Sequence, residues 1–300
     1  MKKVIAILGP TAVGKTKISI MIAKHYGVDI ISGDSVAVYK SLDIGSAKPT
    51  KEEMDGVIHH LIDIREPNEE YSTADFQREA RRIIDNNELS IIAGGTGLYI
   101  KSAIFNYEFM AKGRDLDFGK KYENLSNEEL FKLLLEKDPN IDTTKLHPNN
   151  RKRVLRALEV KEDTGDSIHS FNHKDEPLYD YFICYLSLPR EILYERINKR
   201  VDQMFDDGLE KEVRDLYDKN IYPHAIGYQE FIPYFKGEIT LDEVKETIKL
   251  NTRHLAKRQE TWFKNQMESH FYTVNLDNIN ETINNIIKDI DDWRLKWDFI

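Results

Sequence analysis

The sequence predicts an α/β protein with a P-loop NTPase-like core, built on a parallel sheet, and a helical insertion domain. Three observations lead to this class. A short apolar run over residues 4–8 leads through a glycine-rich loop into a helical pattern. Further apolar runs over 28–32 and 90–93 alternate with helical patterns, as the strands of a parallel sheet do. Between about 111 and 179, charged helical segments follow one another without an obvious strand.

The first part of the predicted core alternates strands and helices. Residues 4–8 form its first strand, and apolar residues at helical spacing after the glycine-rich loop form its first helix. The second strand covers 28–32. A helix over 73–85 then leads to the third strand, over 90–93. Helices placed between strands in this way allow the strands to lie parallel in one sheet.

Helices over 127–137 and 151–163 are predicted in the insertion domain. The strand pattern returns over 181–188, and Pro189 then opens a long amphipathic helix that extends to Met204. The core has therefore resumed by this point of the chain.

The last third of the chain is predicted to be mostly helical, with one helix over 241–265. A C-terminal helix is indicated by apolar residues at helical spacing, which are Ile283, Ile286, Ile287, Ile290 and Trp297. We therefore divide the chain into a core of residues 1–110 and 180–300 and an insertion domain of residues 111–179.

The composition is that of an ordinary globular protein. The 300 residues can bury a large apolar core, and 40% of them are hydrophobic. No run approaches the roughly 18 consecutive apolar residues needed to cross a bilayer, and the N-terminus lacks a secretory pattern. We expect a cytoplasmic monomer without a membrane partner. Cys184, the single cysteine, excludes an intrachain disulfide and is expected to be a buried structural thiol.

A phosphate-binding loop follows the first strand and consists of Gly9, Pro10, Thr11, Ala12, Val13, Gly14, Lys15 and Thr16. In such a loop, backbone N–H groups surround phosphate oxygens, and the following helix directs its positive end at the same charge. Lys15 would donate to the terminal phosphate, and the Thr16 hydroxyl would ligate a magnesium ion (Mg2+). The pattern leaves open which phosphorylated molecule is bound, and whether ATP is one of them.

Two further segments end predicted strands, where ligands bind in open parallel sheets. Asp34 follows the second strand, and its position is compatible with a magnesium ligand, a general base or a helix N-cap. Position alone favours the cap. The turn Gly94-Gly95-Thr96-Gly97 follows the third strand. We interpret its glycines as allowing close backbone approach to a ligand, in chemistry other than nucleotide hydrolysis.

Basic side chains are concentrated on two predicted helices of a chain whose net charge is −9. One group comprises Arg151, Lys152, Arg153 and Arg156, and the other comprises Lys245, Lys249, Arg253 and Lys257, spaced every four residues. Together they fit contacts to a phosphate backbone. For either group alone, a solvated helix face is the favoured interpretation. Trp262 and Phe263 are expected to pack in the core.

Taken together, these segments resemble the bacterial transfer RNA (tRNA) dimethylallyltransferase family. The similar segments occur in the expected order and are 9–16 (GPTAVGKT), 31–39 (ISGDSVAVY), 43–49 (DIGSAKP), 94–100 (GGTGLYI), 147–160 (HPNNRKRVLRALEV), 200–204 (RVDQM), 225–230 (AIGYQE) and 256–263 (AKRQETWF). They cover nearly the whole chain, and several linked motifs are more specific than a P-loop alone.

The resemblance implies a reaction and a role for each catalytic residue. A dimethylallyl group would move from dimethylallyl diphosphate to the exocyclic N6 amine of the adenine adjacent to the anticodon, releasing pyrophosphate. Lys15, magnesium bound to Thr16, and Arg200 would neutralise the leaving group. Asp34 would accept the amine proton. Thr96 would lie where the nucleotide meets the diphosphate channel.

The resemblance also implies that the anticodon stem-loop of tRNA is the partner, contacted by the insertion domain. The implied tRNA-binding residues are Asp34, Ser35, Val36, Ala37, Thr96, Lys152, Arg153, Val154, Leu155, Arg156, Arg253 and Lys257. Val36 and Ala37 depart from the family pattern, which usually has glutamine in place of Ala37, so they bear on acceptor recognition. Three alternatives remain: a prenyltransferase acting on free adenine nucleotides, a P-loop small-molecule kinase, and a noncatalytic RNA-binding module.

Overall fold

The computed structural model describes residues 1–109, 115, 117–168, 170 and 176–295. Its contacts divide the chain into two units. The core comprises Met1–Phe105 and Glu176–Ile300, and the insertion comprises Asn106–Asp175. The predicted boundary after residue 110 and the predicted helical residue Trp297 lie outside the described residues.

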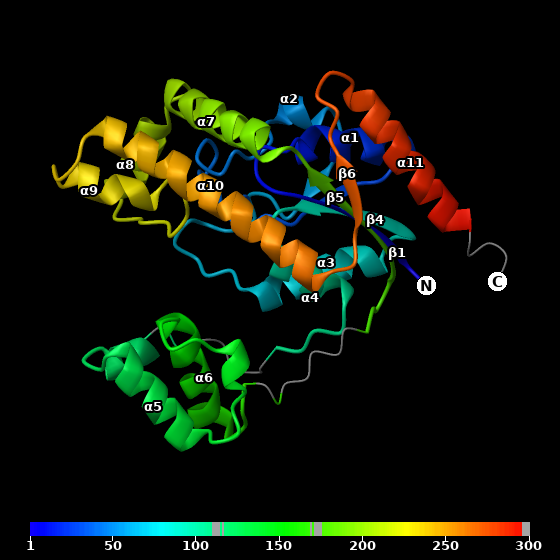
Figure 1. The fold of residues 1–300 in the computed structure, drawn as a ribbon. Helices are drawn as coiled ribbons and strands as arrows, with labels where there is room; N and C mark the ends of the chain where they lie inside the picture. Colours follow the sequence, from blue (N-terminus) through cyan, green and yellow to red (C-terminus); the bar gives the residue numbers. More distant parts are fainter. Residues whose placement is uncertain (110–114, 116, 169, 171–175, 296–300) are drawn as a thin grey trace. The chain divides into compact units, whose positions relative to one another are not determined.

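The core is built on one six-stranded sheet in which every neighbouring pair is parallel (Figure 1). The order across the sheet is β3 (His59–His60), β2 (Ile30–Ser32), β4 (Leu89–Gly94), β1 (Lys3–Leu8), β5 (Asp180–Ser187) and β6 (His270–Thr273). The predicted α/β class with a parallel-sheet core is therefore confirmed.

Side chains of the central strands alternate between two apolar layers, as the pleat of a strand requires. On β1, Val4, Ala6 and Leu8 face one layer, while Ile5 and Ile7 face the other, and all five are fully buried. Two buried faces explain why the strands read as continuous apolar runs.

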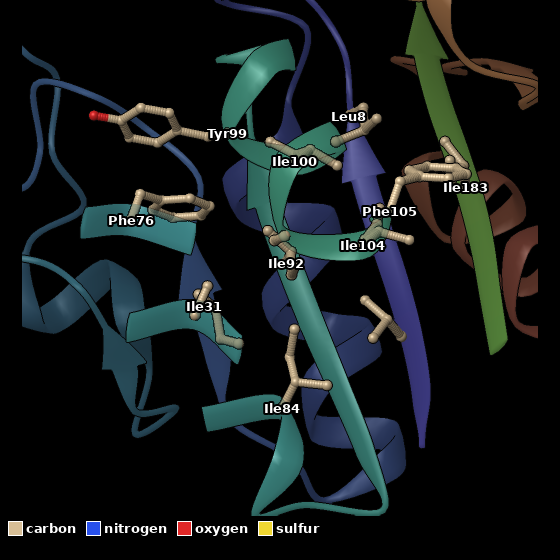
Figure 2. Close-up of a cluster of buried hydrophobic side chains, with 14 of the residues drawn as sticks. Leu8, Ile31, Phe76, Ile84, Ile92, Tyr99, Ile100, Ile104, Phe105 and Ile183 are labelled. Carbon is tan, nitrogen blue, oxygen red and sulfur yellow. The ribbon is translucent and has the colours of Figure 1, made fainter. Parts of the chain in front are cut away.

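Helices from distant parts of the sequence cover the two faces. The first layer contains α3 (Thr73–Asp85) and α4 (Gly97–Ile104). Figure 2 shows Phe76 and Tyr99 from these helices in one cluster with strand residues Ile31 and Ile92. The second layer contains α1 (Lys15–Tyr26), α7 (Arg190–Asp206) and α11 (Ile279–Leu295). Cys184 is buried in this second layer, as expected, and burial raises the pKa of its thiol.

A third apolar cluster joins α7 to further helices of the core. It includes residues of α7, α8 (Leu209–Tyr217) and α10 (Leu241–Gln266), with α9 (Ile232–Phe235) packed against it. The short helix α2 (Lys51–Met54) lies between β2 and β3 in the sequence.

The insertion has its own apolar cluster, formed by α5 (Asn127–Lys137), α6 (Arg151–Thr164) and the segments around them. The domain boundary differs from the predicted one at residue 179. Phe105 pairs with Pro177 in an antiparallel bridge, and the Leu178 N–H donates to the Ile104 carbonyl at 2.9 Å. These backbone contacts hold the segment from residue 176 onward to the core.

Several helices begin where local sequence predicts, because a capping box defines each start. Ser72, Ser126 and Thr240 each accept a hydrogen bond from the backbone N–H three residues later, and the acidic residue there bonds back. Each cap stabilises its helix by about 1 kcal/mol. Within the described residues, every helix is too short or too polar to span a bilayer.

Candidate active site

The phosphate-binding loop joins β1 to α1, as predicted. Gly14 has φ +110°, a left-handed value that an L side chain rarely adopts, so glycine is required there. Ala12 also lies in the left-handed region, at φ +64°. The Val13 side chain is fully buried in the second apolar layer, so Val13 serves the loop through its backbone. The loop therefore holds a conformation that its surroundings must stabilise.

Two side chains that we did not predict as site residues stabilise this loop. Arg196 on α7 donates through Nε to the Ala12 carbonyl at 2.8 Å. Gln259 on α10 accepts from the Thr11 N–H at 3.1 Å and donates to the Gly95 carbonyl at 3.0 Å. Arg196 precedes Arg200 by four residues, so the two lie on one helix face. That spacing was the available signal for Arg196.

A cavity of about 700 Å³ opens beside the loop. The predicted site residues Lys15, Thr16, Asp34 and Arg200 line it together. The lining also includes Ser35, Val36, Ala37 and Gln259, and an apolar portion with Val201, Met204, Ile248 and Leu255. The cavity thus places positive side chains, a carboxylate and apolar surface within one space.

Lys15 and Arg200 are both partly buried cations. Burial and the nearby charge of Arg200 lower the pKa of Lys15 to about 7, while Asp34 acts in the opposite direction. Burial also lowers the pKa of Arg200, again opposed by Asp34. The Lys15 ammonium donates to the Gly9 and Pro10 carbonyls at 2.9 and 2.7 Å. Two partly desolvated cations in one cavity favour an anionic ligand.

Asp34 caps the turn that follows it. Its position alone had favoured a helix N-cap, but no helix begins within residues 33–50. Its Oδ1 accepts hydrogen bonds from the Val36 and Ala37 N–H groups, at 2.8 and 3.3 Å. Within the described part of the chain, Oδ2 accepts no hydrogen bond. The side chain is thus oriented by one oxygen while the carboxyl group lines the cavity.

The glycine turn at the end of β4 packs closely against other parts of the protein. A Cβ atom on Gly94 would lie 2.3 Å from the Gly33 carbonyl oxygen, and one on Gly95 would lie 2.4 Å from Nε2 of Gln259. A Cβ atom on Gly97 would lie 2.2 Å from the Trp262 ring. These glycines admit groups of the protein itself. Gly94 and Gly95 also line the cavity, so their approach to a ligand stays a prediction.

Thr96 lies within this turn but is not among the residues that line the cavity. Its hydroxyl oxygen accepts from the Ser35 N–H at 3.3 Å, and Ser35 does line the cavity. Thr96 therefore supports the segment that follows Asp34.

The basic residues of α6 divide by exposure. Lys152 and Arg153 are exposed, whereas Val154 is fully buried in the insertion core and Leu155 packs against it. The side chain of Val154 therefore stabilises the helix and cannot touch RNA. Arg156 pairs with the buried Glu159 at 2.8 Å.

Arg151 has a structural role as well. Its guanidinium donates to the Tyr122 and Leu125 carbonyls, at 2.5 and 2.7 Å.

The basic stripe of α10 faces α7 over most of its length. Lys245 and Lys249 pair with Asp202 at 2.9 and 2.8 Å, and Arg253 donates to Asn198 at 2.7 Å. Of these four side chains, only that of Lys257 is exposed. Most of the stripe therefore joins two helices.

The parallel sheet, the phosphate-binding loop and the cationic cavity define a P-loop enzyme with a site for a phosphorylated substrate. Comparison with known proteins identifies a more specific family within this class. The chain belongs to the IPP transferase family, whose model matches residues 37–266. This confirms the family that the sequence motifs predicted.

Named relatives and solved structures agree with this family. A tRNA dimethylallyltransferase from Enterococcus faecalis is 47% identical over 291 residues, covering 91% of this chain and 92% of that protein. One from Oceanobacillus iheyensis is 44% identical and covers 96% of each chain. A crystal structure of tRNA delta(2)-isopentenylpyrophosphate transferase from Staphylococcus epidermidis has TM-score 0.72 and 39% identity, covering 97% of this chain and 99% of that one. The structure of a eukaryotic dimethylallyltransferase acting on tRNA has TM-score 0.84 and 27% identity, covering 99% and 80%.

Proposed function

We propose that this protein transfers a dimethylallyl group from dimethylallyl diphosphate to the N6 amine of the adenine adjacent to the anticodon in tRNA. The observation that carries the proposal is the cavity in which Lys15, Arg200 and Asp34 meet beside the phosphate-binding loop. The reaction needs a cationic site for a departing diphosphate and a group that takes a proton from the amine. The relatives named for this activity support the same assignment.

Lys15 and Arg200 assist the departure of pyrophosphate in this proposal. Negative charge grows on the bridging oxygen as the allylic C–O bond breaks, and cations held in a low-dielectric cavity stabilise that charge strongly. Both side chains are partly buried there, and the backbone N–H groups of the loop add further donors.

Asp34 accepts the amine proton. An aromatic amine is a weak nucleophile, so it must lose a proton as the new C–N bond forms. The hydrogen bonds from Val36 and Ala37 to Oδ1 hold the carboxylate in one orientation, which leaves Oδ2 to take the proton.

Magnesium is part of the proposal, with Thr16 as its protein ligand. Among the described residues, no group of three or more His, Cys, Asp or Glu side chains is arranged to hold a metal. The donor set fits magnesium nonetheless, because this ion takes few protein ligands and completes its shell with phosphate oxygens and water. Thr16 lines the cavity. When bound, the ion would add positive charge next to the diphosphate.

The acceptor assignment to tRNA rests on the insertion and its exposed cations. A target adenine is stacked in the anticodon loop and must be flipped out to enter the cavity, at a cost of about a few kcal/mol. Lys152 and Arg153 would contact the phosphate backbone of the tRNA. We further propose that the enzyme is a monomer, and its substrate implies a cytoplasmic location.

The test incubates the protein with dimethylallyl diphosphate, magnesium and unmodified tRNA, followed by mass spectrometry of the digested nucleosides. We expect a prenylated adenosine and stoichiometric pyrophosphate. Prenylation of free adenine nucleotide, but not of tRNA, would instead identify the small-molecule prenyltransferase. Phosphate transfer from ATP without pyrophosphate release from dimethylallyl diphosphate would identify a kinase.

Removing the two exposed cations of α6 tests the RNA surface. The double variant Lys152→Ala/Arg153→Ala is expected to bind tRNA roughly tenfold more weakly, and the slope of log K against log salt should fall by about 1–2, since each lost phosphate contact removes about 0.7–0.9. Filter binding at several salt concentrations measures both. Arg156 stays intact because its loss would leave the buried Glu159 without its ion pair.

The matched control is Lys219→Ala/Lys236→Ala, which removes the same charge from exposed positions of the core. We expect its salt slope to equal that of the wild type. An unchanged salt slope in the Lys152/Arg153 variant would show that these two side chains do not contact RNA phosphates and are only solvated.

A further inference from the structure

A carboxylate on α8 is enclosed by donors from a distant loop. Oε2 of Glu212 accepts from the N–H groups of Asp43 and Ile44, at 3.1 and 2.8 Å. Oε1 accepts from the Gly45 N–H at 3.0 Å and from the Tyr228 hydroxyl at 2.8 Å. Three successive backbone N–H groups therefore converge on one side chain, an arrangement that binds anions well. Hydrogen bonds to an ionised acceptor are also stronger than those between neutral groups.

Close contact reinforces this arrangement. A Cβ atom on Gly45 would lie 2.6 Å from the Tyr228 ring, so only glycine permits the ring to sit against the loop. Tyr228 is 1% exposed, and burial together with the Glu212 carboxylate raises the pKa of its hydroxyl. The hydroxyl therefore stays protonated and remains a donor to Glu212. Gly45 and Tyr228 belong to two of the segments that resemble the family. These contacts show that both residues help to hold Glu212 against the loop.

The same loop leads directly to Arg200. Ala47 has φ +51°, a strained value for alanine, and its carbonyl accepts from Nη2 of Arg200 at 3.2 Å. The next residue, Lys48, is nearly buried and donates to the Tyr39 carbonyl at 2.8 Å. Gly45 and Ala47 line the cavity, whereas Glu212 does not.

We propose that Glu212 is a positioning residue for Arg200: it holds the loop over residues 43–48 so that the Ala47 carbonyl orients the guanidinium toward the phosphate-binding loop. This inference rests on the proposed function for the role of Arg200 in turnover. Glu212 acts only through the loop, because it has no place on the cavity wall. Replacing it with glutamine would turn one acceptor into a donor facing N–H or O–H groups, so the loop would move while the helix stays intact.

The test is a double-mutant cycle between Glu212→Gln and Arg200→Ala, with turnover and pyrophosphate affinity measured for all four proteins. In the protein that keeps Arg200, we expect Glu212→Gln to lower kcat about tenfold with the KM for tRNA unchanged. In the Arg200→Ala background, the same substitution should change kcat less than twofold. Equal losses in both backgrounds would overturn the proposal, because a merely structural role does not depend on Arg200.

Two further variants complete the design. Glu210→Gln is the control, since Glu210 lies on the same helix and pairs with Arg214 at the surface; we expect wild-type kcat. Tyr228→Phe removes one hydrogen bond to Glu212 and keeps the ring, so it should show a smaller loss with the same dependence on Arg200. If Glu212→Gln does not fold, the Tyr228→Phe cycle decides the question, and additive losses there would overturn the proposal.

Measuring both turnover and pyrophosphate affinity allows a failure of this inference to be distinguished from a failure of the proposed function. A wild-type protein that binds pyrophosphate but forms no prenylated adenosine would refute the proposed function. The affinity cycle would still test the link between Glu212 and Arg200. An active wild type with additive cycles in both readouts would refute the positioning role alone.

Discussion

Replacing Asp34 with alanine is expected to lower kcat for prenyl transfer by roughly 10²–10⁴-fold, the usual contribution of a positioned general base. Pyrophosphate affinity should stay within a few-fold of the wild-type value, because the loop and its cations remain. Steady-state kinetics with tRNA and calorimetric titration with pyrophosphate measure the two quantities. Turnover near the wild-type level would exclude Asp34 as the base.

The Asp34→Asn variant distinguishes the proposed role of Asp34 as a general base from its role in capping the turn. The asparagine side-chain oxygen can still accept from the Val36 and Ala37 N–H groups, so the local turn is kept, but the amide cannot take a proton at neutral pH. We expect a loss of kcat close to that of the alanine variant. An active asparagine variant combined with an inactive alanine variant would show that only the cap matters.

Replacing Lys15 with methionine is expected to lower kcat by roughly 10²–10³-fold, because one cation that faces the leaving group is removed. Methionine keeps the apolar stem of the side chain. Unlike Asp34→Ala, this change should also weaken pyrophosphate binding, which calorimetry detects directly. Wild-type affinity in the variant would place the diphosphate away from Lys15.

The lowered pKa of Lys15 adds a pH dependence to the same measurement. Below about pH 7 the free protein carries a charged Lys15, whereas above it the amine is mostly neutral. Binding a diphosphate favours the charged form, so at higher pH the complex must take up a proton, and affinity should fall as pH rises above 7. Calorimetry in buffers of different ionisation enthalpy measures this uptake. The methionine variant reports the ligand's own ionisation, and an identical pH profile in both proteins would contradict the prediction.

Structural features that depend only on residues close together in the chain were predictable from the sequence. The helices over 73–85 and 127–137 have the predicted bounds because their capping boxes and apolar spacing are local. The phosphate-binding loop was equally clear, since its geometry depends on glycines and a lysine at fixed spacing.

The two edge strands could not be predicted. The strand β3 has two residues, and β6 has mostly exposed side chains, so neither has a readable apolar pattern. Each is a strand because a longer neighbour provides hydrogen-bonding partners.

The candidate site shows the same division. Lys15 and Asp34 were recognisable because each follows a strand that ends at the cavity, whereas Gln259 was not, because its partners Thr11 and Gly95 are more than 160 residues away in the chain. The glycines of the turn over 94–97 predicted that another group comes close to the backbone. Their spacing could not predict that at Gly97 this group is the Trp262 ring.

By itself, the sequence determined the fold class, the phosphate-binding loop, most helices and the family, since these depend on local patterns and on linked motifs. Only the tertiary structure decided which charges serve the site. Regular spacing placed Lys245, Lys249 and Arg253 on one helix face, but the neighbouring α7 provides Asp202 and Asn198 as their partners. The free energy of a charged side chain depends on what packs against it, and those neighbours come from distant parts of the chain.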